Sequence, residues 1–338
     1  MQNKKHHRSR LKTTLVTAAW GIAALAPVNG DEPPDPARFG LVVATHAPDE
    51  GGLQLKWPTH IAFGPGTREV VTDLKNNRFV YRDSAKDAWQ ASPVAVSGPH
   101  SLVHNPADGL YYANDTENHR IIAFRDLSSG TIAAQTGSIA GVTLKRPHDI
   151  LIDPATNWIY ALNPHSGHVF RFTAIGENVS AVQAPAGGYA RALSLVNGKL
   201  YVIGSAKGRI VKIVDWDTPT FQTYDSHDPT GKSGSGGSWT KTGLVINDAE
   251  FFDGSWYATS YFSQSYAGGT DSDENKFIRF KTLDDLVAGN WTDLSSLVPG
   301  GMNPYFLTSH GGSLFLAIFN HESPGTGDAI LRLTPVAN

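Results

Sequence analysis

Residues 98–124 read GPHSLVHNPADGLYYANDTENHRIIAF and contain the pattern that decides the fold. A proline opens a short apolar run, and a turn rich in Asn, Pro, Asp and Gly follows it. A second apolar run begins at Leu110, and a third covers residues 121–124 after a polar loop. Short apolar runs separated by such turns are typical of antiparallel β-strands. The stretch therefore predicts three strands of one sheet.

The same order of strand, turn, strand, loop and strand recurs along the chain. Two further copies are close, at residues 57–81 and 146–172, and three are weaker, at residues 189–213, 245–280 and 303–333. With an outer strand added to each, six units repeating every roughly 40 to 60 residues predict an all-β, six-bladed β-propeller. A spare apolar strand at residues 39–44 is expected to complete the sheet of the last blade and to close the ring.

The loop between the second and third strands has its own pattern. Residues 115–121 read DTENHRI and residues 73–79 read DLKNNRF, so both have Asp, Asn and Arg at the same spacing. This pattern resembles the NHL-repeat type of β-propeller. The resemblance extends over residues 39–335 and implies six blades. We expect the Asp and Arg of the pattern to tie neighbouring strands and turns together.

The residue after each opening proline, or its equivalent where the proline is missing, marks the start of the innermost strand. In a propeller these starts meet at one mouth of the central channel. The six residues at this position are Thr59, His100, His148, Arg191, Asn247 and Tyr305. The six residues at the next position are His60, Ser101, Asp149, Ala192, Asp248 and Phe306. Ionisable side chains converging in one funnel are the default hypothesis for a functional site.

Each residue type in this ring suits a definite chemical task. Histidine is a natural general base and a common zinc ligand. Arginine holds a carboxylate or phosphate through two parallel hydrogen bonds. Tyrosine transfers a proton when a neighbouring cation lowers its pKa. Each histidine also has a structural interpretation, as a channel residue that is hydrogen-bonded to water.

Residues 99–102 and 147–150, with the sequences PHSL and PHDI, are similar to motifs of peptidyl-hydroxyglycine α-amidating lyase. That family is a secreted NHL-type propeller with zinc-binding histidines in its channel and a structural calcium nearby. The resemblance implies that His100 and His148 bind zinc and that Asp149 contacts calcium. A third equivalent histidine is absent, because Thr59 occupies that position and His60 follows it. We take the propeller and a polar channel from this resemblance, and not the amidating reaction.

The N-terminus has the pattern of an export signal. Residues 1–12 carry five Lys or Arg and no acid, a 12-residue apolar run follows at 15–26, and small residues end the segment near Gly30. This predicts a signal peptide at residues 1–30 and one propeller domain at residues 31–338, secreted or periplasmic. The apolar run is shorter than the about 20 residues that a membrane span needs, so no span is expected after cleavage.

Charge and cysteine content exclude several classes of function. The chain has 28 basic and 31 acidic residues, and removing residues 1–30 takes the net charge from −3 to −8. Nucleic-acid binding needs clustered basic residues, so no nucleic-acid partner is expected. The chain contains no cysteine, which excludes disulfides and thiolate metal sites. We expect a monomer.

These observations lead to two hypotheses of different class. The first is a lyase or hydrolase that acts on a small molecule, a peptide or an anionic glycan. In it Arg191 holds an anionic group, Tyr305 or His60 moves a proton, and Asn247, Asp248 and His321 contact the substrate. A divalent metal, Zn or Ca, bound by His100, His148 and Asp149 would polarise a carbonyl or activate water, and no organic cofactor is expected. The second is a non-catalytic NHL-type propeller that binds protein or glycan.

Overall fold

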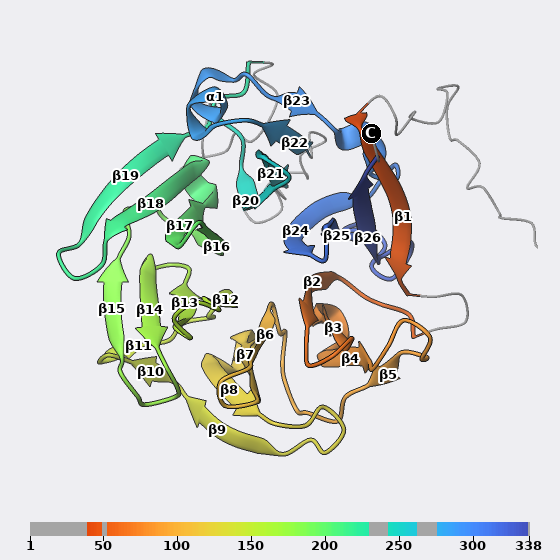
Figure 1. Ribbon diagram of the computed structural model, residues 1–338, viewed down its shortest axis with the longest axis vertical. Helices are drawn as coiled ribbons and strands as arrows, with labels where there is room; N and C mark the ends of the chain where they lie inside the picture. The colour runs from red at the N-terminus through yellow and green to blue at the C-terminus, as the bar shows by residue number, and fades with distance from the viewer. Residues whose placement is uncertain (1–38, 49–52, 230–242, 262–275, 337–338) are drawn as a thin grey trace, which may run out of the picture. The chain divides into compact units, whose positions relative to one another are not determined.

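The computed structural model describes residues 39–48, 53–229, 243–261 and 276–336, which all belong to one compact unit, residues 34–338. The predicted signal peptide lies outside the described residues. Six four-stranded antiparallel sheets are arranged as the blades of a β-propeller (Figure 1). The predicted fold is therefore confirmed.

Each of the first three blades is formed by four strands in chain order, from the innermost to the outermost. Blade 1 consists of β2 (Pro58–Phe63), β3 (Glu69–Asp73), β4 (Arg78–Arg82) and β5 (Gln90–Ala91). Blade 2 consists of β6 (Leu102–Asn105), β7 (Leu110–Asp115), β8 (Arg120–Phe124) and β9 (Ile132–Thr136). Blade 3 consists of β12 (Asp149–Ile152), β13 (Ile159–Asn163), β14 (His168–Phe172) and β15 (Ser180–Gln183).

The fourth and fifth blades follow the same order, and the sixth takes its outermost strand from the start of the chain. Blade 4 consists of β16 (Ala190–Val196), β17 (Lys199–Gly204), β18 (Arg209–Asp215) and β19 (Thr220–Asp225). Blade 5 consists of β20 (Ile246–Phe252), β21 (Ser255–Ser260), β22 (Lys276–Phe280) and β23 (Thr292–Asp293). Blade 6 consists of β24 (Asn303–His310), β25 (Ser313–Phe319), β26 (Ala329–Pro335) and β1 (Leu41–Ala47).

Apolar side chains fill the spaces between neighbouring blades. Between blades 1 and 2, for example, Val70 and Phe79 pack in one cluster with Tyr111 and Phe124. All four are buried, and the rings of Phe79 and Phe124 are stacked. Burial of apolar area on both faces of each blade is the main force that holds such a ring together. The six innermost strands remain around the centre, where the functional site is expected (Figure 1).

The Asp and Arg of the repeated loop have the structural role predicted for them. The Asp73 carboxylate accepts hydrogen bonds from the backbone N–H of Lys56 and from Arg78 Nε, at 2.6 and 2.7 Å. A single 3₁₀ turn, η2 (Leu74–Asn76), lies between Asp73 and Arg78 in the sequence. It ends at Asn77, whose backbone is in the left-handed region. The same turn recurs in blade 2 as η3 (Thr116–Asn118) and in blade 4 as η4 (Ser205–Lys207).

The N-terminal strand closes the ring as expected. β1 pairs antiparallel with β26, with Leu41 opposite Pro335 and Ala44 opposite Arg332. The pairing brings the two ends of the described chain together in one sheet (Figure 1). A bulge between Thr45 and Ala47 leaves His46 without a paired residue in β26.

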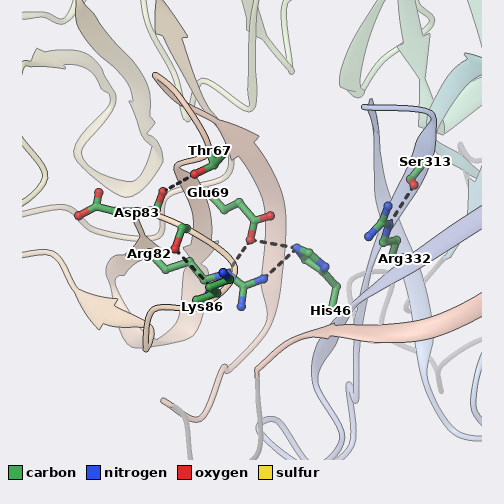
Figure 2. Close-up of polar contacts among 9 residues, drawn as sticks. His46, Thr67, Glu69, Arg82, Asp83, Lys86, Ser313 and Arg332 are labelled. Carbon is green, nitrogen blue, oxygen red and sulfur yellow. Dashed lines mark hydrogen bonds and ion pairs between the residues drawn. The ribbon is translucent and has the colours of Figure 1, made fainter.

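His46 connects the closing strand to blade 1. Its Nε2 lies 3.0 Å from Glu69 Oε2, which also accepts from Arg82 Nε at 2.7 Å (Figure 2). The Arg82 guanidinium lies over the ring of Trp89 at 4.5 Å. The closure therefore rests on strand pairing and on a second, buried polar contact, which we call the closure latch (His46, Glu69 and Arg82).

Some elements lie outside the predicted repeat. They are a small hairpin of β10 (Ser138–Ile139) and β11 (Val142–Thr143), the helix α1 (Leu283–Ala288) and the 3₁₀ turn η6 (Ser295–Leu297). α1 begins with a capping box in which Thr282 and Asp285 bond each other's backbone N–H groups. Among the described residues, no helix is long and apolar enough to cross a membrane.

Candidate active site at one end of the channel

β-bulges lie at four of the six predicted ring residues. The pairing register shifts at Thr59 in β2, at Arg191 in β16, at Asn247 in β20 and at Tyr305 in β24. A bulge inserts an extra residue that re-aims its side chain. His100 and His148 reach the equivalent place differently, because they lie just before β6 and β12.

A pocket of about 290 Å³ lies where the innermost strands begin. It is lined by one acid, three cations, three histidines and a group of aromatic side chains. We call it the mouth pocket, and its lining residues are Trp57, Thr59, Leu74, Lys75, His100, Glu117, Arg146, His148, His165, Tyr189, Arg191, Tyr261, Tyr305 and Phe319. Of the predicted site residues, it brings together His100, His148, Arg191 and Tyr305.

The two histidines form a stacked pair deep in this pocket. The ring centroids of His100 and His148 are 3.8 Å apart and the planes are 29° from parallel. His148 Nδ1 lies 3.0 Å from the backbone oxygen of Arg191. Because a carbonyl oxygen only accepts, Nδ1 carries the proton and Nε2 keeps the lone pair.

Both histidines are neutral at pH 7. Burial, followed by the positive charge of Arg191, holds the pKa of His100 well below 6.5. Burial, followed by the interaction with His100, does the same to the pKa of His148. A neutral imidazole with one nitrogen fixed as a donor is suited to accept a proton at the other.

Arg191 links the histidine pair to Tyr305. Its Nη1 donates to the Tyr305 hydroxyl at 3.2 Å, and its guanidinium lies 5.3 Å from the centre of the Tyr189 ring. Arg191 and Tyr305 are both buried. A buried guanidinium at the wall of a pocket can hold a carboxylate or phosphate.

Two other cations and an aromatic wall complete the pocket. The aromatic wall consists of Trp57, Tyr261, Tyr305 and Phe319. The Lys75 ammonium lies 4.5 Å from the centre of the Trp57 ring, and Arg146 Nη2 lies 2.6 Å from Glu117 Oε1. Sequence reasoning did not single out Trp57, Lys75 or Arg146. Trp57 and Arg146 each directly precede the opening proline of a blade. This shared position in the repeat is the sequence feature from which they could have been predicted.

The arrangement does not fit a metal ion shared by His100 and His148. An ion bound by two imidazoles lies in the plane of both rings. Stacked rings have planes that lie one above the other, and His148 Nδ1 is already engaged. Among the described residues, no group of three or more His, Asp or Glu side chains could hold a metal. We therefore derive no step through a metal.

Three other predicted residues line a second cavity that follows the innermost strands. His60, Asp149 and Asp248 line a separate cavity of about 950 Å³, so the prediction that they join the histidine pair is not supported. The reason is the alternation of side chains along a strand, since each follows a mouth residue by one position. Burial lowers the pKa of His60 to about 4.

The carboxylates that line this second cavity connect blades. Asp149 accepts from the backbone N–H of Leu193 in blade 4, and Asp248 accepts from that of Leu307 in blade 6, both at 2.7 Å. Burial raises the pKa of Asp149 to about 7 and that of Asp248 well above its ordinary value. Calcium contact by Asp149 is therefore not supported, because its oxygens accept backbone N–H groups.

The remaining two predicted substrate contacts are not in the lining of the mouth pocket. Asn247 is fully buried, and neither its Oδ1 nor its Nδ2 has a hydrogen-bond partner among the described residues. The His321 ring stacks on Trp57, with the two ring centroids 5.3 Å apart. A substrate role for either residue stays a prediction.

Comparison with known proteins identifies the fold class. Virginiamycin B lyase from Staphylococcus aureus is 13% identical, with a TM-score of 0.55 over 87% of this chain and 98% of that one. A putative gluconolactonase is 14% identical, with a TM-score of 0.59 over 87% and 92%. The PQQ-bound aldose sugar dehydrogenase of Streptomyces coelicolor is 15% identical, with a TM-score of 0.55 over 87% and 98%.

At this identity the likeness shows the fold alone. No protein-family model matches the chain, and no curated protein matches it in sequence. The resemblance to NHL repeats and to the amidating lyase is therefore not confirmed. The chain is a six-bladed β-propeller, and structures named as a lyase, a lactonase and a dehydrogenase share its architecture.

Proposed function

We propose that this protein is a lyase or hydrolase that acts on a small anionic substrate in the mouth pocket. The observation that carries the proposal is the buried His148, whose Nδ1 proton is held by the Arg191 carbonyl, so that Nε2 carries the lone pair. A propeller that only binds a ligand on its surface does not require such a buried, oriented base. The enzymes among the structures of the same fold add support.

The chain's own residues supply three functions in this proposal. His148 Nε2 takes a proton, from water in a hydrolysis or from the substrate in an elimination. Arg191 holds the anionic group of the substrate and orients the Tyr305 hydroxyl, which is placed to donate to the leaving group. The aromatic wall around Trp57 excludes water and strengthens these polar contacts.

The proposal includes export, because residues 1–30 have the pattern of a signal peptide. An exported enzyme of this kind acts in the periplasm or outside the cell. N-terminal sequencing of the protein recovered from the periplasm or the medium tests this part, with a start near Asp31 as the expected result. Recovery of the intact chain from the cytoplasm would contradict it.

The catalytic part is tested with a panel of carboxylate-bearing lactones and esters, followed by proton release at constant pH. Turnover of at least one class is expected. His148→Gln should lower kcat by 10²-fold or more, a typical contribution of a general base. Because the pKa of His148 lies well below 6.5, the rate should stay level from pH 8 down to pH 6. A rate that halves near pH 6.5 would contradict a base depressed by burial.

A further inference from the structure

The second cavity combines an apolar wall with a group of acidic side chains. Five of the six innermost strands contribute apolar side chains to its lining, and β20 contributes the carboxylates of Asp248 and Glu250. The carboxylate of Asp149, on β12, is the third acid of the described lining. The volume of about 950 Å³ is large enough for a small organic ligand.

The three carboxyl groups lie within electrostatic reach of one another. Asp149 and Asp248 are buried, with 6% and 3% of their surface exposed. After burial, the charges of Asp149 and Glu250 both raise the pKa of Asp248, and the charge of Glu250 also raises the pKa of Asp149. Acids that repel one another in a shared cavity are neutralised either by protons or by a bound cation.

Neutral donors hold these carboxylates in place. The hydroxyls of Ser194 and Ser309 donate to the two oxygens of Glu250, at 3.3 and 2.6 Å. Asp149 and Asp248 accept from backbone N–H groups. Because a carboxylate oxygen has two lone pairs, each of these oxygens can still accept from a ligand. The hydrogen bonds within the described residues therefore position the acids without bringing a positive charge to them.

His60 adds an imidazole to the lining of the same cavity. Its Nδ1 is buried and has no hydrogen-bond partner among the described residues. Burial lowers the pKa of this ring to about 4, so it is neutral at pH 7. A buried polar atom without a partner is costly, and a ligand that donates a hydrogen bond would satisfy it.

We propose that the second cavity binds an organic cation, a primary amine that carries an apolar group. The ammonium group lies among Asp149, Asp248 and Glu250, and the apolar group packs against side chains such as Leu195 and Phe306. An ammonium group donates three diverging hydrogen bonds, which suits acceptors spread around a cavity. A bare metal ion fits less well, because no group of three or more His, Asp or Glu side chains within the described part of the chain could hold one.

This site is separate from the proposed function, whose substrate is an anion in the mouth pocket. The two cavities share no residue among those described in their linings. Each can therefore be tested without the other.

Titration calorimetry tests the proposal with cyclohexylmethylamine and cyclohexylmethanol, a neutral analogue of nearly the same shape. At pH 8 the wild type should bind the amine at least about tenfold more tightly, because hydrogen bonds to a charged donor are about twice as strong as neutral ones. Ammonium chloride should not bind measurably, because it lacks the apolar group. Equal affinity for amine and alcohol, or binding of neither, would overturn the proposal.

The pH dependence of binding provides a readout that needs no variant. The titratable side chains in the described lining come from β2, β6, β12, β20 and β24, and they are His60, His104, Asp149, Asp248, Glu250 and His310. Burial lowers the pKa of the three histidines, so they are neutral at pH 7 and above. Burial raises the pKa of Asp149 and Glu250 to about 7.

The ammonium group therefore displaces protons from these acids when it binds near pH 7. Affinity for the amine should rise about tenfold from pH 6 to pH 8, because a group with a pKa of about 7 is mostly protonated at the first pH and mostly ionised at the second. Binding at pH 7 should release protons into the buffer. A level affinity over this range, without proton release, would contradict the assignment of these acids.

Glu250→Gln removes one acid and keeps an oxygen acceptor for a serine hydroxyl. It should weaken amine binding at least about fivefold, through the loss of a charged acceptor, and leave alcohol binding within about twofold. Glu177→Gln is the matched control, because Glu177 is exposed and lies outside the described lining of the cavity. The control should bind the amine like the wild type. Equal weakening in both variants would assign the effect to overall charge and overturn the site.

His148→Gln separates this site from the mouth pocket. The variant should keep the wild-type affinity for the amine, whatever happens to turnover in the mouth pocket. If amine binding is lost in His148→Gln and kept in Glu250→Gln, the amine binds in the mouth pocket and the second site is wrong. Binding that is kept in His148→Gln and weakened in Glu250→Gln supports the second site, even if no substrate is turned over.

Discussion

Replacing Glu69 with Gln should destabilise the closed ring by about 3 kcal/mol. Glu69 and Arg82 side chains are only 12% and 4% exposed, and Glu69 Oε2 is shared by Arg82 and His46 at 2.7 and 3.0 Å. Removing one partner of a buried ion pair typically costs about 3–5 kcal/mol, because the other charge stays buried. Gln keeps one oxygen acceptor, so we take the lower end of this range.

The measurement is urea unfolding of both proteins at several pH values. Burial raises the pKa of Glu69, but hydrogen bonds and charge from His46 and Arg82 outweigh it, and the net pKa lies below 4.5. The stabilising contribution is therefore present above pH 4.5 and lost as the pH falls through the folded-state pKa. The difference between wild type and Glu69→Gln should be full at pH 7 and shrink below pH 4.5.

Asp83→Asn is the matched control, since it removes an ion pair of the same type at the surface. Arg68 and Asp83 are 28% and 56% exposed, and their closest atoms are 2.6 Å apart. The expected loss is below about 1 kcal/mol. Equal losses in Glu69→Gln and Asp83→Asn would refute the reasoning that burial of the closure latch decides its contribution.

Three further predictions concern the second cavity, the repeated loop and metal binding. Burial raises the pKa of Glu250 to about 7, so the folded protein binds a proton there more strongly than the unfolded chain and loses stability as the pH rises toward 7. Glu250→Gln should therefore gain stability relative to wild type between pH 6 and pH 8, measured by urea unfolding, and a relative loss would contradict this. Arg120→Ala leaves the fully buried Asp115 without the Nε donor at 2.6 Å and should cost about 2 kcal/mol, whereas no change in the urea midpoint would show that Asn118 and the backbone suffice. Dialysis against EDTA should leave the melting temperature unchanged, because the stacked imidazoles do not converge on one point; a fall that zinc reverses would contradict the described arrangement.

The strands, the six blades and the ring closure could be predicted because their signals are local or repeat. The sequence of each blade contains the same pattern of apolar runs and turns. The clear copy at residues 98–124 makes the weaker copies recognisable. The loop acids Asp73 and Asp115 also follow from the repeat. The closure latch did not follow, because His46, Glu69 and Arg82 meet only in three dimensions.

The functional site was predicted in part, for a physical reason. The position after the opening proline correctly placed His100, His148, Arg191 and Tyr305 in one pocket. The next position failed, because one step along a strand turns the side chain to the other face of the sheet, and His60, Asp149 and Asp248 line the second cavity instead. Arg146 was missed because its backbone is in the left-handed region, which directs its side chain into the pocket. The pattern of apolar residues does not indicate such a backbone conformation.

The most direct test of the central claim is the ratio of kcat/KM values for wild type, His148→Gln and His165→Gln on the best substrate of the ester and lactone panel. His165 also lines the mouth pocket, where its ring packs edge-on against that of Tyr189, and it serves as the matched control. We predict a loss of 10²-fold or more for His148→Gln, a change within about threefold for His165→Gln, and unchanged melting temperatures. Full activity of His148→Gln would contradict the assignment of the mouth pocket as the active site.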